Sequence, residues 1–345
     1  MYRFIYEASG GERGVTACSA LRRHAHSASR KVAVAMLFVL GFSAPASAHC
    51  IVGNRFFPST LIVDDPCVAD EMSMPTIAEF KNGDDPSAQE LDISGEFDKT
   101  ITKNFGVSIG DTWVHLNVPG GGSVQGFDNL ESGFKYQFLT VPAAELAMSV
   151  SLDVDWGGTG NRAVGADPFT TLTPTFFVGQ GFGFLPESMK FFKPLAVTAQ
   201  VGYALPTEST TSSINESSGL LTTTPNPQFL AWGGSLQYSM PYLKSAVQDL
   251  SLPDFFNHLI PLVEWDLETQ VANFDGGERT TGTINPGVIY VANKYQLSVE
   301  AMIPVNRASG DDVGVIGQLH LYLDDMFPNS FGRPLLALLT EPRSQ

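Results

Sequence analysis

The chain has 345 residues, with 20 basic and 36 acidic side chains, a formal net charge of −16 and a pI near 4.7. Nucleic-acid binding needs a basic face, so this balance argues against it. A content of 43% apolar and 11% aromatic residues excludes a disordered chain. Charged residues make up only 16% of the total, against about 25% in a typical soluble domain. The composition fits a polar β protein, a class that includes outer-membrane barrels.

Residues 1–48 have the pattern of a secretory signal peptide with a long n-region. Basic residues at 22, 23, 30 and 31 precede an apolar run of 11 residues, 32–42, which is too short to span a membrane. Ala46, Ser47 and Ala48 supply a cleavage site, so we predict export through the inner membrane and cleavage after Ala48. Cleavage removes six basic and two acidic residues, which leaves 14 basic and 34 acidic ones.

Cys50 and Cys67 are the two cysteines that remain after cleavage. In an exported chain, such a pair predicts a disulfide that closes the N-terminal segment.

Period-two alternation of apolar and polar residues recurs along the rest of the chain and predicts short strands. The clearest stretch is 146–156, where Leu146, Met148 and Val150 alternate with Ala147, Ser149 and Ser151. We expect eleven strands near 90–101, 104–118, 128–140, 145–157, 169–184, 195–205, 227–240, 259–271, 281–292, 294–305 and 312–324. The Ser/Thr-rich stretch 207–225 is expected to be an external loop, and residues 243–250 one or two helical turns.

Three features favour a membrane barrel over a soluble sandwich. Acidic residues occupy the polar faces of the strands, which suits a watery lumen. Aromatic residues such as Trp156, Tyr203 and Tyr238 lie near the ends of the apolar faces. Long and short connections alternate, as they do between the two sides of an outer-membrane barrel.

Strand parity adds one more strand. Bacterial single-chain barrels have even strand numbers, so we place a twelfth strand within 75–81. We therefore predict an all-β fold, a closed antiparallel transmembrane β-barrel of about twelve strands over residues 75–326. Residues 49–74 form an N-terminal periplasmic or plug segment, and residues 327–345 a C-terminal tail.

Four stretches resemble an outer-membrane family named for the meta-pathway of phenol degradation: 257–264 (NHLIPLVE), 282–287 (GTINPG), 301–307 (AMIPVNR) and 318–325 (QLHLYLDD). The resemblance implies an outer-membrane β-barrel that serves as a transporter or channel. It implies no catalytic residues and does not identify phenol as the solute.

Inward-facing charges are the candidate site. The expected lumen-lining residues are Asp92, Glu96, Asp98, Lys135, Asp153, Asp155, Glu264, Asp266, Glu268, Glu300 and His320. Only Lys135 clearly opposes the acids, and an acidic lining favours cations over anions. A solvated or ion-paired lining is the alternative.

We predict no enzymatic activity and no catalytic, cofactor or metal site. His320 faces the lumen by alternation, on the wrong side for a lipid-cleaving centre. The expected function is passive passage of small solutes, either hydrophobic aromatics or cations, with outer-membrane lipid as the other partner. A structural or surface-interaction barrel with an occluded lumen is the first alternative, and a soluble periplasmic β protein the second.

Overall fold

The structure, a computed structural model, describes residues 50–83, 87–214, 221–274 and 278–340. The export signal expected within residues 1–48 lies outside this range. No helix in these ranges is long and apolar enough to cross a membrane.

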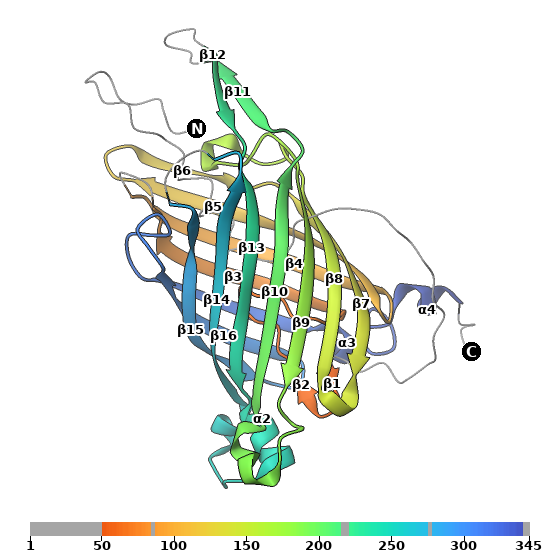
Figure 1. Cartoon of the computed structure of the whole chain (residues 1–345). Helices are drawn as coiled ribbons and strands as arrows, with labels where there is room; N and C mark the ends of the chain where they lie inside the picture. Colours follow the sequence, from red (N-terminus) through yellow and green to blue (C-terminus); the bar gives the residue numbers. More distant parts are fainter. Residues whose placement is uncertain (1–49, 84–86, 215–220, 275–277, 341–345) are drawn as a thin grey trace.

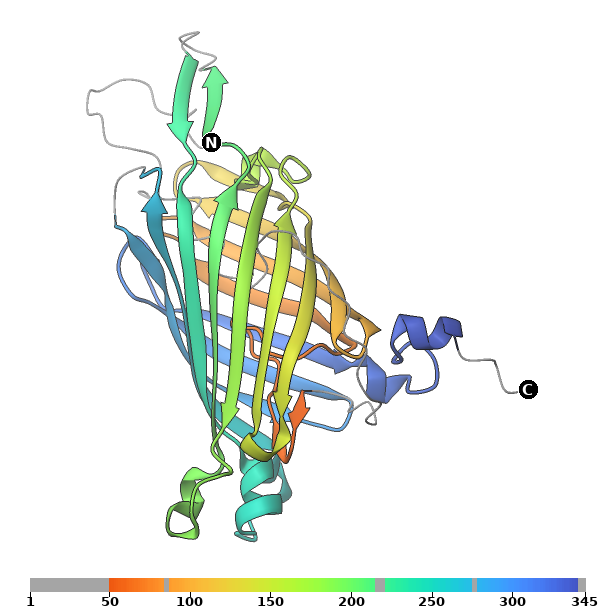
Figure 2. The ribbon, with the colours of Figure 1, turned by 45° about the vertical axis from the view of Figure 1, so that its right-hand side comes forward.

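Twelve antiparallel strands close into a barrel (Figures 1 and 2). They are β3 (Glu71–Lys81), β4 (Gln89–Thr102), β5 (Phe105–Val118), β7 (Glu131–Val141), β8 (Leu146–Asp155), β9 (Thr171–Gly181), β10 (Leu195–Pro206), β13 (Gln228–Tyr238), β14 (Leu259–Ala272), β15 (Thr280–Val291), β16 (Tyr295–Pro304) and β17 (Gly314–Tyr322). Each pairs with the next around the ring, and β17 pairs with β3, Ile316 opposite Ala78, which closes the barrel. The predicted fold class and strand number are confirmed.

The strand in front of residue 90 is longer than the sequence indicates. β3 begins at Glu71, so the barrel starts four residues before the expected boundary at 75. The pairing of β3 with β4 shifts register between Ser73 and Thr76. A bulge of this kind breaks the period-two pattern, and the first residues of the strand therefore do not stand out in the sequence.

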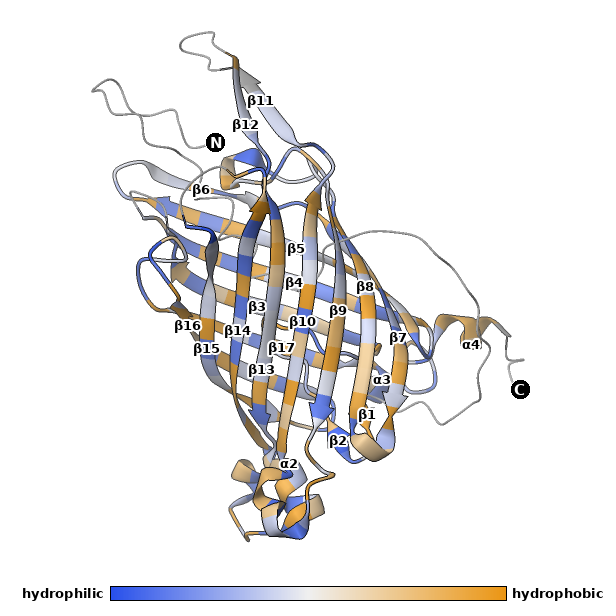
Figure 3. Ribbon diagram, viewed as in Figure 1, coloured by the Kyte–Doolittle hydropathy of each residue, from blue (hydrophilic) through white to orange (hydrophobic). Residues whose placement is uncertain are grey.

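Hydrophobic and hydrophilic residues alternate along the strands (Figure 3), and their burial places the apolar ones on the outer face and most of the polar ones on the inner face. In β14, Val263 is exposed while its neighbours Glu264 and Leu262 are buried. Apolar side chains also line parts of the interior. Phe80, Met302 and Ile316 face inward and pack together with Leu61 and Ile62.

Short strands and helical turns lie at the two ends of the barrel (Figure 1). At one end, β6 (Gly122–Phe127) continues the pairing of β5 beyond β7, and β11 (Thr210–Ile214) pairs with β12 (Leu221–Pro225). The expected loop over 207–225 is therefore largely a hairpin. At the other end lie helical turns at η3 (Glu187–Phe192), α2 (Met240–Tyr242), η4 (Leu243–Val247) and η5 (Asp254–His258).

Three further short helical elements connect or follow strands: η1 (Pro142–Ala144), η2 (Arg162–Val164) and α3 (Leu323–Met326). The C-terminal tail continues from α3 to α4 (Leu335–Thr340), outside the barrel wall.

Candidate functional site

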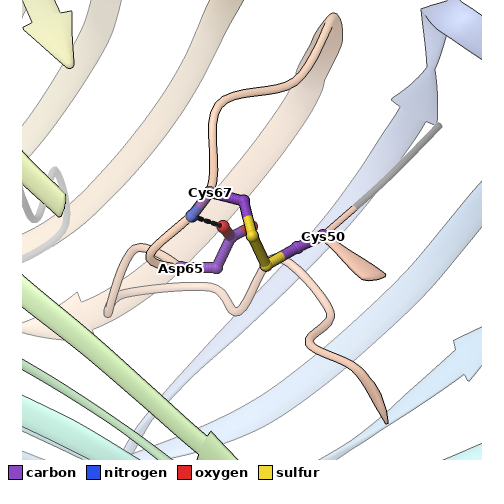
Figure 4. Close-up of side chains that lie close together, drawn as sticks. All are labelled: Cys50, Asp65 and Cys67. Carbon is purple, nitrogen blue, oxygen red and sulfur yellow. Dashed lines mark hydrogen bonds between the residues drawn. A yellow bond between two sulfur atoms is a disulfide. The ribbon is translucent and has the colours of Figure 1, made fainter. Parts of the chain in front are cut away.

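Residues 50–70, here called the N-terminal segment, run inside the barrel and contact inward-facing side chains from widely separated strands. The segment contains the short strands β1 (Ile51–Val52) and β2 (Arg55–Phe56) and the disulfide between Cys50 and Cys67. Figure 4 shows this disulfide beside Asp65, whose Oδ1 accepts the backbone N–H of Cys67 at 2.7 Å. The disulfide closes a loop that spans 17 positions, so the part of the segment that enters the lumen is preorganised.

Arg55 fixes the segment to the end of the barrel that carries the helical turns. Its Nε lies 3.3 Å from Oε2 of Glu145, and its Nη1 donates to the carbonyl oxygen of Pro194 at 2.9 Å. Its Cζ lies 3.9 Å from the centre of the Tyr242 ring. The guanidinium is fully buried, and burial lowers the pKa of Arg55 while the Glu145 carboxylate opposes this shift.

Tyr242 completes the Arg55 site. Its hydroxyl donates to Oε1 of Glu145 at 2.8 Å. Burial, with this hydrogen bond, raises the pKa of Tyr242 to about 12. The phenol therefore remains protonated and holds the carboxylate in place at neutral pH.

Glu264 binds the middle of the segment. Its carboxylate accepts the backbone N–H groups of Leu61 at 3.0 Å, Ile62 at 3.2 Å and Val63 at 3.1 Å. Three successive N–H groups that point at one anion form a concave anion-binding arrangement. Glu264 is 0% exposed, so its carboxylate holds the segment against the barrel wall and is not part of a solvated lumen lining.

Lys135 also binds the segment. Its Nζ donates to Oδ2 of Asp64 at 2.7 Å and to the carbonyl oxygen of Asp65, and it lies 4.8 Å from the centre of the Phe177 ring. The cation expected to oppose the acids of the wall is therefore neutralised largely by the segment. Burial raises the pKa of the Asp65 carboxyl to about 7, against the attraction of Lys135 and with repulsion from Glu71 and Asp64.

His320 belongs to a network that links the segment to β3 and β17. Its Nε2 lies 2.8 Å from Oε2 of Glu71, and its Nδ1 lies 2.8 Å from Oγ of Ser73. Oγ of Ser59 donates to the same Glu71 oxygen at 2.9 Å. The Glu71 carboxylate thus joins the wall to the segment.

The other predicted lining residues all lie on inner faces of the strands. Those buried in the wall are Asp92, Asp153, Asp155, Asp266, Glu268 and Glu300. The Oγ of Ser151 donates to Asp153, and the Glu300 side chain lies across Gly287. Most of the expected lining is therefore packed rather than open to a wide lumen, because the strands are close enough for their polar side chains to fill the interior.

A pocket of about 110 Å³ remains between the segment and the wall formed by β3, β4, β5, β7, β8 and β17. Its lining includes the predicted residues Glu96, Asp98, Lys135, Asp153 and His320. Asp64, Asp65 and Glu71 line it from the segment and the start of β3. The structure therefore brings five of the predicted residues to one acidic pocket and places the others elsewhere in the wall.

The docking residues Arg55, Asp64, Asp65, Glu71 and Glu145 are absent from the sequence-based set. One feature of the sequence could have identified Arg55 as a contact residue: it is the only basic residue between Cys50 and Lys81. Its partner Glu145 is 90 positions away in a connection between strands, and no local pattern links the two.

No family model and no curated protein matches this chain. Among solved structures, the chain is similar to an outer-membrane channel from Pseudomonas putida F1, with a TM-score of 0.45 and 10% identity over 74% of this chain and 95% of that one. It is similar to the β domain of the Bordetella autotransporter BrkA, with a TM-score of 0.43 and 13% identity over 74% and 99% of the two chains. The NanC porin gives a TM-score of 0.42 and 8% identity over 72% and 98%. Likenesses of this size assign neither a family nor a solute.

Proposed function

We propose that the protein is a channel-like β-barrel of the outer membrane that passes small cations through a lumen narrowed by the N-terminal segment. The observation that carries this proposal is the division of residues between the two faces of the barrel. Each of the twelve strands exposes at least one large apolar side chain. Representatives in ring order are Ile77, Ile93, Ile109, Phe134, Val150, Phe176, Val201, Trp232, Val263, Ile284, Leu297 and Val315.

A continuous apolar belt with a polar interior is what a barrel in a bilayer requires. A closed barrel also satisfies every ladder hydrogen bond internally, which is necessary where no water is available. Together these features support membrane insertion and disfavour the soluble periplasmic alternative. Export with cleavage after Ala48 remains a prediction and is consistent with this location.

The charge of the pocket supports cations as the solutes. Glu96, Asp98 and Asp153 line it from the strands, while the Nζ of Lys135 is engaged by Asp64 and that of Lys99 by Asp70, each at 2.7 Å. An acidic constriction with low-dielectric walls raises the local concentration of cations. This lining favours cations over hydrophobic aromatics, and the resemblance to the phenol meta-pathway family remains a prediction.

A structural barrel with an occluded lumen is the second candidate. It is favoured by the segment itself, which occupies the interior, and by the burial of Asp266, Glu268 and Glu300 in the wall.

The test is single-channel recording of the purified protein in planar bilayers, with the reversal potential measured under a KCl gradient. We expect steps that favour K⁺ over Cl⁻, and reduced selectivity in the double variant Glu96→Gln, Asp98→Asn. Asp266→Asn is the matched control, because this buried acid lies on an inner face but does not line the pocket.

Deletion of residues 50–70 separates the two candidates. A narrowed channel conducts before the deletion and conducts more after it. A structural barrel shows no conductance before the deletion, whether or not it conducts after it. Failure of the protein to insert into bilayers would overturn the membrane assignment itself.

A further inference from the structure

The chain continues past the last barrel strand into a short, leucine-rich helix. After β17 and α3, a turn leads to α4, whose sequence is LLALLT. Four leucines of this helix are exposed, and Leu339, at 72%, is the most exposed of the large apolar side chains in the described part of the chain. A run of leucines facing outward in this way marks an interaction surface.

The leucines share one side of the helix. At about 100° per residue, Leu335, Leu336, Leu338 and Leu339 cover about 160° of arc, and Ala337 lies opposite them. Ala337 is only partly exposed, and α4 packs against β4. The helix therefore turns its small residue toward the barrel and its leucines away from it.

Two contacts hold the tail on the outer wall at a polar rim. The Phe331 ring lies 5.7 Å from that of Phe97 on β4, and Nζ of Lys99 donates to the carbonyl oxygen of Arg333 at 2.9 Å. Lys99 also pairs with Asp70, where the N-terminal segment enters β3. Phe97 is paired with Ile109, whose side chain is 50% exposed. The helix thus begins where charged groups of the rim meet the apolar belt.

We propose that α4 lies in the lipid–water interface of the membrane, beside the barrel, with its leucines in the acyl region of the bilayer. The proposal rests on the proposed function, because it requires the belt to be in lipid. The helix packs against β4, a strand that carries part of the apolar belt, and no charged residue interrupts 334–340. Short interfacial helices bind bilayers through one such apolar face. A second copy of the chain is a poorer partner for the leucines than lipid. A stable protein interface buries about 800 Å² on each partner, and a six-residue helix offers a much smaller area.

The test uses a nitroxide spin label in the full chain carrying Cys18→Ser. Cys50 and Cys67 are held in the disulfide, so an added cysteine is the single free thiol. The label is placed at Leu339→Cys, at Val150→Cys on the belt and at Ser212→Cys on the β11–β12 hairpin. The protein is reconstituted in vesicles of phosphatidylethanolamine and phosphatidylglycerol, and collisions with oxygen and with a water-soluble nickel chelate are measured.

We expect the ratio of oxygen to nickel collisions at residue 339 to be several times that at residue 212 and to approach that at residue 150. Adding Leu335→Ser and Leu338→Ser should shift the ratio at residue 339 toward the value at residue 212. A water-like ratio at 339 with a lipid-like ratio at 150 overturns the interfacial helix alone. Water-like ratios at both positions overturn the membrane assignment. Dipolar broadening between labels at 339 would show that a second copy is the occupant, against the proposal.

Discussion

The Glu264 carboxylate accepts the backbone N–H of Val63 at 3.1 Å, across 201 positions of the sequence. With the N–H groups of Leu61 and Ile62 on the same carboxylate, this contact holds the N-terminal segment against β14. An acid on the inner face of a barrel can thus bind a segment of its own chain rather than a solute.

Replacing Glu264 with Gln should therefore release the segment. The change removes charge-assisted hydrogen bonds that contribute about 1.5–3 kcal/mol, or about 10- to 150-fold in the ratio of docked to undocked segment. We expect a larger mean conductance in planar bilayers. Glu268→Gln is the control, because Glu268 lies on the same face of β14 and has no hydrogen bond to the segment within the described residues. Equal conductance in the two variants would contradict the docking role.

Arg55→Ala should free the end of the segment near Glu145. Breaking a buried ion pair leaves a carboxylate without its partner, which costs about 3–5 kcal/mol. Arg55→Lys should not restore docking, since an ammonium cannot contact Glu145, two carbonyl oxygens and the Tyr242 ring at the same time.

Hydrogen exchange of the amides of residues 50–70 measures the effect of both Arg55 variants. We expect protection to fall in the segment while the amides of β13 and β14 stay protected. Loss of protection throughout the barrel would show that Arg55 supports the whole fold instead.

Removing the disulfide by Cys50→Ser with Cys67→Ser should loosen the segment and spare the barrel. A disulfide that closes a loop of this length restricts the unfolded segment and so stabilises its folded form by about 3 kcal/mol. Limited proteolysis should then cut within residues 50–70, while the heat-modified mobility of the barrel on a detergent gel keeps its usual transition temperature. A barrel that unfolds at a markedly lower temperature would mean that the disulfide stabilises the strands as well.

The N-terminal segment should dock less tightly as the pH rises toward neutrality. In the docked state burial raises the pKa of Asp65 to about 7, with Glu71 and Asp64 adding repulsion and Lys135 opposing it. An exposed aspartate has a pKa of about 3.9, so protonated Asp65 favours docking. The contribution of protonated Asp65 to docking is complete below about pH 4 and is lost as the pH rises to about 7. Over this range the ratio of docked to undocked segment falls by up to about tenfold per pH unit.

Conductance recorded between pH 5 and pH 8 measures this effect. It should rise with pH in the wild-type protein. In Asp65→Asn, which keeps a neutral acceptor for the N–H of Cys67, the rise should be smaller. The same pH profile in both proteins would assign the titration to another group.

The alternation of residues in the sequence was sufficient to predict eleven of the twelve barrel strands, and strand parity supplied the twelfth. Asp153 and Glu264 occur between apolar neighbours at period two, and the side chains of a strand alternate between its faces whatever the strand pairs with. The inward placement of all eleven candidate residues follows from this local rule. The start of β3 did not follow from it, because a bulge between Ser73 and Thr76 shifts the register.

The sequence by itself thus determined the approximate strand bounds and the two faces, because these depend on neighbours one or two residues apart. Loop lengths, the acidic faces and strand parity indicated the barrel. Only the tertiary structure decided what the inner acids bind. Glu145 meets Arg55, Glu264 meets Val63 and Lys135 meets Asp64 across 90, 201 and 71 positions. Such contacts form only when the closed ring sets the width of its interior and the N-terminal segment enters it. No local pattern in the chain encodes that width.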